Sequence, residues 1–458
     1  MPDLHPHAQR RFAREVVAAL RAAGYEAYWA GGCVRDHVLG RQPKDYDVAT
    51  AATPDQIREV FGRRRTLAIG AAFGVITVLG AADEGQVEVA TFRQDLDYSD
   101  GRRPDSVVFT TAEEDARRRD FTINGLFFDP VDERVMDFVG GQEDIRRGLI
   151  RAIGDPHERF REDKLRMLRG VRFAATFSFA LHPDTQAAIQ RMAGEVTIVS
   201  PERIAQEMRT MLTHATRAGA MTLLRETGLL SVILPEAVAM RGLAQHKPRQ
   251  PDGDLWDHTL LVLEELRDPS FPLALAGLLH DVGKPETAAH AKGRLSFYDH
   301  EIVGERIAQR ICRRWKLSTK EEDRVTWLVR KHMYLAEARK MRWAKLQRML
   351  VTEGIEELLD LHEADARASG GDTADADYCR QLLLQPPEEL SPPQLLTGHD
   401  LIRHGVPPGK IFQVLLERVR DAQLEKTIRT KREALELVDR LIEEGADEGD
   451  APIATEVD

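Results

Sequence analysis

Two glycines followed by two closely spaced aspartates constrain this fold more than any other feature of the sequence. Residues 31–50 read GGCVRDHVLGRQPKDYDVAT and follow a short apolar run at 25–30, a pattern typical of a strand that enters a glycine turn. Because Gly31 and Gly32 lack a Cβ, the backbone can approach a ligand closely there. The Arg35 guanidinium, one helical turn later, is suited to bind a phosphate through paired hydrogen bonds. The segment therefore predicts a phosphate-binding turn.

The two aspartates, Asp45 and Asp47, lie two residues apart. In a strand this spacing places both carboxylates on one face. Neighbouring carboxylates repel each other, and a divalent cation between them removes the repulsion. A DxD pair alone is more often a solvated turn, but here the glycines and the arginine precede it. Together these features predict metal-dependent nucleotidyl transfer.

Length and composition indicate a multidomain protein without a membrane span. The chain has 458 residues, of which 42% are hydrophobic and 30% charged, so three or four domains are expected. It contains no run of about 18 apolar residues, and its N-terminus lacks the apolar core of a signal peptide. Three scattered cysteines, Cys33, Cys312 and Cys379, favour reduced thiols and a cytoplasmic protein. The net charge of −11 argues weakly against nucleic-acid binding, although arginine-rich segments could form a basic stripe.

The spacing of apolar residues predicts an α+β head followed by helices. A helix is expected over 8–23, and strands are expected over 25–30, 45–50, 74–79, 86–91 and 107–110. After about residue 150 the pattern is almost entirely helical. We expect a head at 1–150, a helical neck at 151–240, a histidine-bearing helical domain at 241–375, a helical tail at 376–445 and a disordered end at 446–458.

The pattern GGxxRDxxLG…DxD resembles the nucleotidyltransferase superfamily that includes DNA polymerase β. It is more closely similar to class II tRNA nucleotidyltransferases and bacterial poly(A) polymerases. This resemblance implies a mixed-sheet polymerase β-like head followed by all-α neck, HD and tail domains. It also implies that Asp45 and Asp47 bind two Mg²⁺ ions.

Two further head motifs extend the resemblance. Glu88, in the strand-like run QVEVATFR, resembles the third metal-binding carboxylate of class II enzymes. The motif RRDFTINGLFFD resembles the sequence that supports the ribose and phosphates of the incoming nucleotide. Its arginines, Arg118 and Arg119, suit phosphates, and the Asn124 amide can both donate to and accept from a 2′-hydroxyl. Asp120 is expected to orient the arginines.

The segment at 95–109, DLDYSDGRRPDSVVF, looks like the flexible loop of CCA-adding enzymes, although the residues alone indicate only a hairpin loop. Farther on, Ser200 and the following proline mark a helix start in SPERIAQEMRTML. This sequence resembles the ERIxxE helix of CCA-adding enzymes. Bacterial poly(A) polymerases tend to have an LFEE-like sequence at this place. The chain therefore favours CCA addition.

The neck carries the second informative segment, DPHERFREDKLRMLRGVRF at 155–173. Asp163 and Arg166 are three residues apart, so on a continuous helix they would share a face and form a pair. In the family that it resembles, an EDxxR pattern reads the incoming base without a nucleic-acid template. The resemblance assigns Asp163 and Arg166 to the base and Arg169 to the phosphates, with Arg172 as a further nucleotide-binding candidate. A salt-bridged surface helix is the simpler alternative.

Six histidines and aspartates farther along resemble the ligands of HD metal-dependent phosphohydrolases. Adjacent histidine and aspartate side chains on a helix are about 100° apart and can both reach one cation. Imidazole and carboxylate ligands do not select one divalent metal. The expected ligands are His258, His280, Asp281, His300, His332 and Asp365.

The tail, from LLTGHDLIRHG onward, resembles the segment that grips tRNA in CCA-adding enzymes. Gly409 and Lys410 are suited to a helix N-terminus near a backbone phosphate. The whole sequence predicts a CCA-adding enzyme that acts on tRNA with CTP and ATP. The alternatives are a bacterial poly(A) polymerase, an HD phosphohydrolase that acts on RNA 2′- or cyclic phosphates, and an RNA-binding protein without catalysis.

Overall fold

The computed structural model describes residues 6–96, 106–244, 253–291 and 294–444. Two compact units make up this part of the chain. The first contains 1–243, 268–275 and 309–322, and the second contains the remaining segments. The tip of the predicted loop, 97–105, and the predicted disordered end lie outside the described residues.

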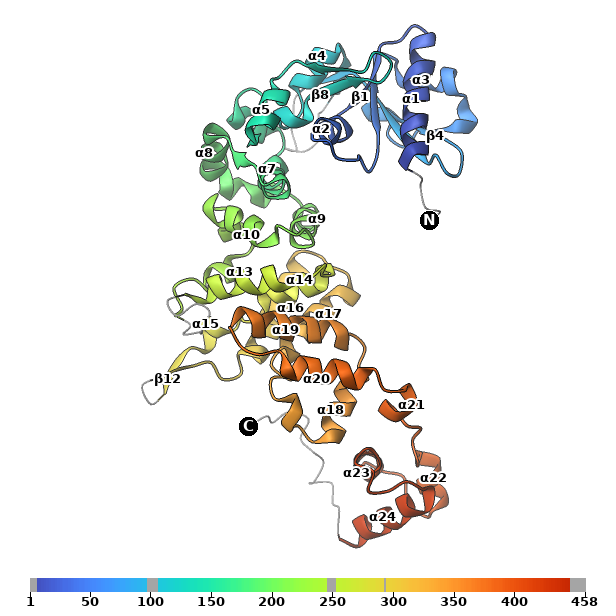
Figure 1. Cartoon of the computed structure of the whole chain (residues 1–458), viewed down its shortest axis with the longest axis vertical. Coiled ribbons are helices and arrows are strands. Elements are labelled where there is room, and N and C mark those ends of the chain that lie inside the picture. Colours follow the sequence, from blue (N-terminus) through green and yellow to red (C-terminus); the bar gives the residue numbers. More distant parts are fainter. Residues whose placement is uncertain (1–5, 97–105, 245–252, 292–293, 445–458) are drawn as a thin grey trace. The chain divides into compact units, whose positions relative to one another are not determined.

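A seven-stranded sheet forms the centre of the head (Figure 1). Its order is β3-β4-β5-β2-β1-β8-β9, with β2 and β5 parallel and the other neighbours antiparallel. The predicted mixed sheet is therefore confirmed. The strands are β1 (Ala27–Ala30), β2 (Asp47–Thr50), β3 (Thr66–Leu67), β4 (Val75–Leu79), β5 (Gln86–Thr91), β8 (Leu126–Asp129) and β9 (Arg134–Asp137).

Helix α1 (Pro6–Ala22) packs against β1, β2 and β5. Its apolar positions Phe12, Val16 and Leu20 are buried, as the helical spacing predicts. The other head helices are α2 (Gly32–Val38), α3 (Pro54–Phe61), α4 (Ala112–Arg117) and α5 (Gly141–Arg147), with short 3-10 turns η1 (Arg63–Arg65), η2 (Ala71–Phe73) and η3 (Thr122–Asn124).

The predicted loop after the sheet begins and ends in an antiparallel hairpin. Strand β6 (Arg93–Leu96) pairs with β7 (Ser106–Phe109), and Thr110 donates its backbone N–H to the Phe92 carbonyl. The hairpin thus confirms the simpler interpretation of the loop ends.

The neck consists of short helices. They are α6 (Pro156–Glu162), α7 (Leu165–Phe177), α8 (Pro183–Met192), η4 (Ala193–Ile198), α9 (Pro201–Leu212), α10 (Arg217–Glu226), α11 (Leu229–Ile233) and α12 (Pro235–Val238), with the strand pair β10 (Leu149–Ile150) and β11 (Ala180–Leu181). Helix α7 buries Leu165, Leu168 and Val171, the side that its sequence marks as apolar. The opposite side of α7 carries the arginines that the site uses.

The remaining helices belong to the C-terminal half of the chain. They are α13 (Leu255–Glu265), α14 (Phe271–Leu279), α15 (Lys284–Thr287), α16 (His300–Arg314), α17 (Thr319–Lys331), η5 (Ala338–Lys340), α18 (Trp343–Leu350), α19 (Ile355–Ala368) and α20 (Ala374–Leu383). A small hairpin joins β12 (Ala289–Ala291) to β13 (Arg294–Ser296). Helices α13 and α19 pack together, which matters because each carries a residue of the histidine cluster.

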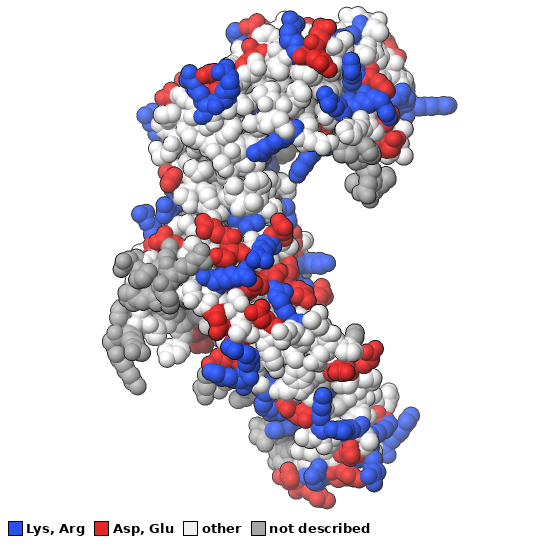
Figure 2. Space-filling model, in the orientation of Figure 1, with Lys and Arg blue, Asp and Glu red and all other residues white. Residues whose placement is uncertain are grey.

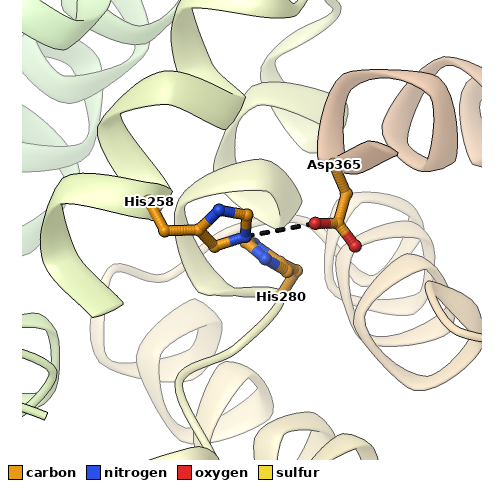
Figure 3. A group of neighbouring side chains, drawn as sticks. All are labelled: His258, His280 and Asp365. Atoms are coloured by element: carbon orange, nitrogen blue, oxygen red, sulfur yellow. Dashed lines mark ion pairs between the residues drawn. The ribbon is translucent and has the colours of Figure 1, made fainter. Parts of the chain in front are cut away.

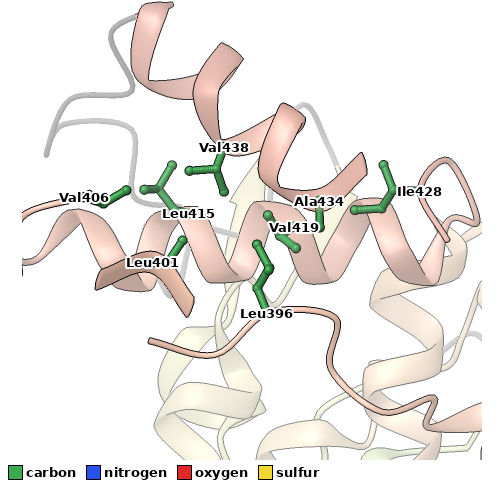
Figure 4. Packing of buried hydrophobic residues seen from close by; sticks show 8 residues of the cluster. All are labelled: Leu396, Leu401, Val406, Leu415, Val419, Ile428, Ala434 and Val438. Carbon is green, nitrogen blue, oxygen red and sulfur yellow. The ribbon is translucent and has the colours of Figure 1, made fainter. Parts of the chain in front are cut away.

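The tail has an apolar core of its own. Its helices are α21 (Pro387–Leu390), α22 (Gly398–Arg403), α23 (Ile411–Leu424) and α24 (Lys431–Glu443). Leu415 and Val419 of α23 pack against Val438 of α24 and against Leu396 and Leu401 (Figure 4). The described helices include none that is long and apolar enough to span a membrane.

Candidate functional site

Three carboxylates meet at the ends of two parallel strands. Asp47 on β2 is the register partner of Glu88 on β5, so their side chains lie on the same face of the sheet. Asp45 lies in a bend before β2 begins, so the expected strand alternation does not apply to it. All three nevertheless line one cavity of about 780 Å³. The cavity thus brings together the three predicted acids.

The ionisation of Asp47 reflects this crowding. Desolvation among protein atoms, and after it the charges of Asp45 and Glu88, raise the pKa of Asp47 to about 6. The Arg119 guanidinium acts in the opposite direction. Neighbouring carboxylates repel each other when all are ionised, and a bound divalent cation removes this repulsion. A divalent cation is therefore the expected ligand of these acids.

The glycine turn also has the predicted geometry. Gly31 has a φ of 72°, and a Cβ there would lie 3.0 Å from Nη1 of Arg119. A side chain at this position would therefore strain the backbone and contact the arginine. Helix α2 begins at the next residue, Gly32, where a Cβ would meet only ordinary contacts. The requirement for glycine thus rests on Gly31.

Arg35 of α2 is held in place on several sides. Its Nη1 donates to Oδ1 of Asn124 at 2.8 Å, and its Nε donates to Asp36 at 2.9 Å. The guanidinium carbon lies 5.4 Å from the ring centre of Phe173 and 4.6 Å from that of Phe177. This cation–π contact fixes the guanidinium plane at the pocket wall.

The RRD motif is oriented by two aspartates. Asp115 accepts hydrogen bonds from Arg118 at 2.7 Å and from Arg119 at 2.9 Å. Asp120 accepts instead from Arg169 of the neck at 2.9 Å and from the Asn124 amide at 3.0 Å. The expectation that Asp120 orients its neighbouring arginines is therefore wrong, because Asp115, one helical turn earlier, occupies that position.

Buried Asp120 is strongly ionised. Burial alone would raise its pKa, but the charge of Arg169 and the hydrogen bond from Asn124 lower the pKa of Asp120 to about 2. Asp120 thereby fixes a neck arginine and a head amide at the same place. This contact joins α7 to the RRD motif within the first unit.

Asp163 and Arg166 do not form the expected helical pair. Asp163 follows the last residue of α6 in an extended conformation, and α7 begins only at Leu165. Its carboxylate accepts from the Leu165 backbone N–H at 3.0 Å and from Nη2 of Arg203 at 2.7 Å. Arg166 bonds to Glu162 and donates to the Arg159 carbonyl at 3.1 Å. Both side chains still line the same pocket.

An arginine-lined pocket of about 420 Å³ gathers the predicted nucleotide-binding residues. It is lined by Gly31, Gly32, Arg35, Asp47, Arg118, Arg119, Asp120, Asn124, Asp163, Arg166 and Arg169. Arg172, the remaining candidate, is not among the lining residues and donates to Glu207 at 2.6 Å.

Sequence reasoning missed three residues of this pocket, Leu165, Phe173 and Arg203. Arg203, on α9, lines the pocket through its bonds to Asp163. Phe173 lines it from α7, and its ring lies under the guanidinium groups of Arg35, Arg169 and Arg172. Their signals were present, since Arg203 belongs to the ERI motif and Phe173 ends the neck segment. The contacts themselves are long-range and no local pattern reveals them.

Arginine-rich segments do not produce a uniform basic stripe. Arg117 pairs with Glu113, Arg159 with Glu162 at 2.9 Å, and Arg161 with Glu158. On the face drawn in Figure 2, basic and acidic side chains are interspersed. The pocket arginines are paired as well, Arg118 and Arg119 with Asp115, Arg169 with Asp120 and Arg203 with Asp163.

The six expected HD residues converge in the second unit. They form two neighbouring groups, His258, His280 and Asp365 in one (Figure 3), and Asp281, His300 and His332 in the other. His258 lies 3.1 Å from Asp365, and His280 lies 3.2 Å from Asp281. His280 and Asp281 occupy a turn after α14, so the expectation that they lie on a helix is wrong.

Backbone contacts orient the imidazoles toward the centre of the cluster. Nδ1 of His280, His300 and His332 each lies 2.8 Å from the carbonyl three residues earlier. This contact makes Nδ1 the donor and leaves Nε2 as the metal-binding atom. Gly283 brings α16 close, because a Cβ there would lie 2.1 Å from the His300 carbonyl.

The donor set fits a divalent cation. Nε2 of His280 and both ring nitrogens of His258 are buried, and the two Nε2 atoms lie 3.2 Å from Asp281 and 3.1 Å from Asp365, respectively. Burial alone would raise the pKa of Asp281, but His280 and Lys284 hold it well below its usual range. The Lys284 ammonium lies 2.6 Å from Asp281. An ionised carboxylate surrounded by imidazole nitrogens is suited to bind a metal.

Comparisons with family models support this arrangement. The poly A polymerase head domain matches residues 27–151, and the probable RNA and SrmB-binding site of polymerase A matches 178–240. The HD domain matches 256–370. The three matched regions therefore include the carboxylates, the second part of the neck and the histidine cluster.

Relatives of two kinds are similar to the chain. The CCA-adding enzyme of Geobacillus stearothermophilus is 44% identical over 216 residues, which are 47% of this chain and 52% of the relative. Poly(A) polymerase I of Salmonella typhi is 41% identical over 234 residues, 49% of this chain and 50% of the relative. The chain thus spans about half the length of the curated relatives it matches.

A solved structure extends the likeness along the chain. The Bacillus stearothermophilus CCA-adding enzyme in complex with CTP superposes with a TM-score of 0.73 at 28% identity. The superposition covers 96% of this chain and 99% of that chain. The shared architecture therefore includes head, neck and the C-terminal helices.

Proposed function

We propose that this chain, which belongs to the family that contains CCA-adding enzymes and bacterial poly(A) polymerases, is a CCA-adding tRNA nucleotidyltransferase. It adds C, C and A to the 3′ end of tRNA from CTP and ATP without a nucleic-acid template. The observation that carries the proposal is the position of Asp47, which lines both the arginine pocket and the carboxylate cavity. A nucleotide held by the arginines would have its phosphates beside acids suited to Mg²⁺.

Divalent-metal use is general in this family of enzymes. In the proposed site Asp45 and Asp47 would hold two Mg²⁺ ions, with Glu88 on the side of the RNA hydroxyl. When bound, such ions stabilise charge on the attacking and leaving oxygens.

The residues of the chain position the nucleotide. The Gly31 backbone and the Arg119 guanidinium face the triphosphate, and Asn124 faces the ribose. The tRNA 3′-oxygen forms a bond to the α-phosphorus while the bond from that phosphorus to the bridging oxygen of the β-phosphate breaks. Pyrophosphate leaves, and the hydroxyl proton passes to solvent. The transfer depends on position and electrostatics, because the protein forms no covalent bond.

Base selection is assigned to the neck side of the pocket. Asp163 accepts from the exocyclic amine of C or A, and Arg166 donates to a neighbouring ring acceptor. G and U present the opposite pattern at this edge. Arg203 supports the selection because it holds the Asp163 carboxylate at 2.7 Å. Arg169 contacts the phosphates while Asp120 fixes its guanidinium.

Product length separates CCA addition from poly(A) synthesis. The purified chain would be incubated with Mg²⁺, CTP, ATP and a tRNA that lacks its 3′-terminal CCA. We expect three additions that end in A, resolved one nucleotide at a time on a denaturing gel. A long ladder of A residues would replace the proposal by poly(A) polymerase, and two additions would replace it by CC addition.

A second activity is proposed for the histidine cluster. The buried imidazoles and the ionised Asp281 support divalent-metal binding and hydrolysis of RNA 2′- or cyclic phosphates. RNA with a 2′,3′-cyclic phosphate end would be incubated with the chain and Ni²⁺, Mn²⁺ or Mg²⁺. Opening of the cyclic phosphate to a terminal phosphomonoester by the wild type, and retention of the cyclic phosphate with His280→Ala, is the expected result. Ring opening that persists in the variant would assign the hydrolysis to another site.

A cytoplasmic location is part of the same proposal. Cys33, Cys312 and Cys379 are buried free thiols. Burial raises the pKa of both Cys33 and Cys312 to about 12, so the thiols stay protonated. Unpaired thiols of this kind are typical of a reducing compartment.

A further inference from the structure

The head contains a basic cavity that the proposed active site does not use. Its volume is about 310 Å³, and it shares no lining residue with the arginine pocket or with the carboxylate cavity. Four lining residues come from α1, one each from β1 and β8, and two from the turn between β8 and β9. They are His7, Arg10, Arg11, Arg14, Trp29, Phe128, Pro130 and Glu133.

The floor of this cavity belongs to the other face of the sheet from Asp47. Ala30 of β1 is the register partner of Asp47 on β2, so these two side chains lie on one face. Successive side chains of a strand point to opposite faces, and Trp29 therefore lies on the side away from Asp47. A ligand that contacts Trp29 would occupy a place separate from the proposed active site.

The basic residues are placed where an isolated helix disfavours them. Arg14 lies four residues after Arg10 and three after Arg11, so the three side chains share one side of α1. Like charges at this spacing destabilise a helix, and cations near its N-terminus oppose the helix dipole. The first turn of α1 contains no acidic residue that would compensate. A bound anion would remove both penalties.

The three arginines are only weakly paired with acids. Arg11 lies 3.8 Å from Glu15 and 3.6 Å from Glu84, which are distances too long for strong hydrogen bonds. For Arg10 and Arg14, which are exposed, no ion pair is found within the part of the chain that the structure describes. The cavity therefore has an excess of positive charge.

Trp29 supplies an observation that is independent of charge. It is 2% exposed and lines the cavity, and its indole N–H is buried without a hydrogen-bond partner in the described ranges. An indole can only donate, and a buried donor without an acceptor costs stability. An oxygen atom of a bound ligand would supply the acceptor.

Glu133 indicates what kind of anion fits. This exposed residue lines the same cavity, yet no ion pair joins it to an arginine among the described residues. Because a carboxylate repels a phosphate, Glu133 suits a different part of the ligand, one that donates hydrogen bonds. The floor is aromatic, with the rings of Trp29 and Phe128 5.4 Å apart. The ligand thus combines an anion, a hydrogen-bond donor and an apolar ring.

We propose that this cavity is a second nucleotide site, which binds a nucleoside monophosphate. Arg10 and Arg14 hold the phosphate, and Glu133 accepts a hydrogen bond from the ribose or from an amino group of the base. The base lies against the aromatic floor. The volume is at the lower end of the usual range for ligand pockets, about 300–1,000 Å³, which suits a single nucleotide.

Binding measurements on the full chain separate this site from the arginine pocket. The probes are AMP and, with Mg²⁺, CTP, each titrated by calorimetry without RNA. We expect Arg10→Ala and Arg14→Ala each to weaken AMP binding about tenfold, the scale of one hydrogen bond to a charged group, and to leave CTP binding unchanged. Arg119→Ala should weaken CTP binding and leave AMP binding unchanged. The control Arg63→Ala, an exposed arginine of η1, changes neither affinity.

A second variant tests the floor of the cavity. Trp29→Phe removes the indole N–H and keeps an aromatic ring. We expect AMP to bind about threefold more weakly, the scale of a neutral hydrogen bond. Tryptophan fluorescence should change on AMP binding in the wild type and not in Trp29→Phe.

Thermal unfolding without ligand distinguishes binding from a structural role of the arginines. Arg10→Ala and Arg14→Ala should not lower Tm, because each removes like-charge repulsion from α1. In the wild type AMP should raise Tm, and this rise should be lost in both variants. A Tm that falls without ligand in both variants would mean that the arginines serve the fold, and would overturn the proposal.

Three results of the titrations would also overturn it. The first is unchanged AMP affinity in Arg10→Ala and Arg14→Ala. The second is loss of AMP binding in Arg119→Ala, which would place AMP in the arginine pocket. The third is inorganic phosphate that binds as tightly as AMP, which would leave an anion site without recognition of a nucleoside. If tRNA binding is weakened by these variants and AMP does not bind, the arginines belong to an RNA contact instead. Each of these results would leave the proposed CCA addition untouched.

Discussion

The two acidic centres of this chain differ in how they are exposed. Asp47 and Glu88 are exposed in a cavity that opens to solvent, whereas Asp281 is 2% exposed and lies among three imidazoles and a lysine. For the proposed function, the open site has to admit a nucleotide and an RNA end at every cycle, whereas the closed site is already oriented by backbone contacts. We therefore propose that large substrates exchange in the head and that the histidine cluster retains a small cation.

The largest expected effect comes from a substitution in the head that leaves the histidine cluster intact. Asp45→Ala removes one metal-binding carboxylate, and we expect CCA addition to fall roughly a thousandfold or more, the scale for loss of transition-state charge stabilisation. Metal content of the histidine cluster should be unchanged. Single-turnover transfer to tRNA and metal analysis of the same preparation measure both quantities. Transfer close to the wild-type rate would remove Asp45 from the active site.

The converse variant tests the closed centre. Asp281→Asn removes the ionised carboxylate that contacts His280, His300 and His332. We expect metal affinity to fall about 100-fold, which is the upper end of the losses caused by changes around metal ligands. CCA addition should persist. Equilibrium dialysis with Ni²⁺ or Mn²⁺ measures the loss. His404→Ala, an exposed tail histidine, is the control, and equal loss in both variants would contradict a specific site.

Much of the open site could be predicted because its signals are local. The glycines, the DxD pair and the alternating run at Glu88 each lie within one short segment, and β1, β2, β4 and β5 overlap the predicted strands. Strand β8 was missed because its four residues are all buried. A strand buried on both faces lacks the alternation that identifies a strand.

The rest depends on contacts between distant segments. The sequence EDKLR contains neither glycine nor proline, the residues that usually mark the end of a helix. The break between α6 and α7 at Asp163 was therefore not predicted. The Asp163 side chain accepts a hydrogen bond from the backbone N–H two residues later. Such a local hydrogen bond is a known alternative to helical backbone pairing. The pairs Asp163–Arg203 and Asp120–Arg169 are separated by 40 and 49 residues, and no periodicity encodes them.

A smaller effect would test which residue supports base selection. Arg203→Ala removes the partner of Asp163 and leaves that carboxylate free to move. We expect the KM for CTP and for ATP to rise about tenfold, with more misincorporation of UTP, because a charged hydrogen bond is lost. Arg203→Lys should recover part of the loss, since a point charge replaces a planar fork. Arg191→Ala, an exposed arginine of α8, serves as the control. Unchanged KM values in Arg203→Ala would show that Asp163 needs no support.

The smallest effect concerns stability and its pH dependence. The pKa of Asp120 is about 2 in the fold, against an ordinary value of 3.8. This depressed pKa stabilises the fold above pH 4, and the contribution is lost as the pH falls toward 2, because the protonated carboxyl no longer pairs with Arg169. We expect Asp120→Asn to lose about 2 kcal/mol of unfolding free energy at pH 7 and less at pH 3. Urea denaturation at both pH values measures the difference, with the exposed Asp83→Asn as the control. A loss equal at the two pH values would mean that the ion pair does not supply the stability, and that Asp120 acts through its neutral hydrogen bonds to Asn124 and the Phe121 backbone.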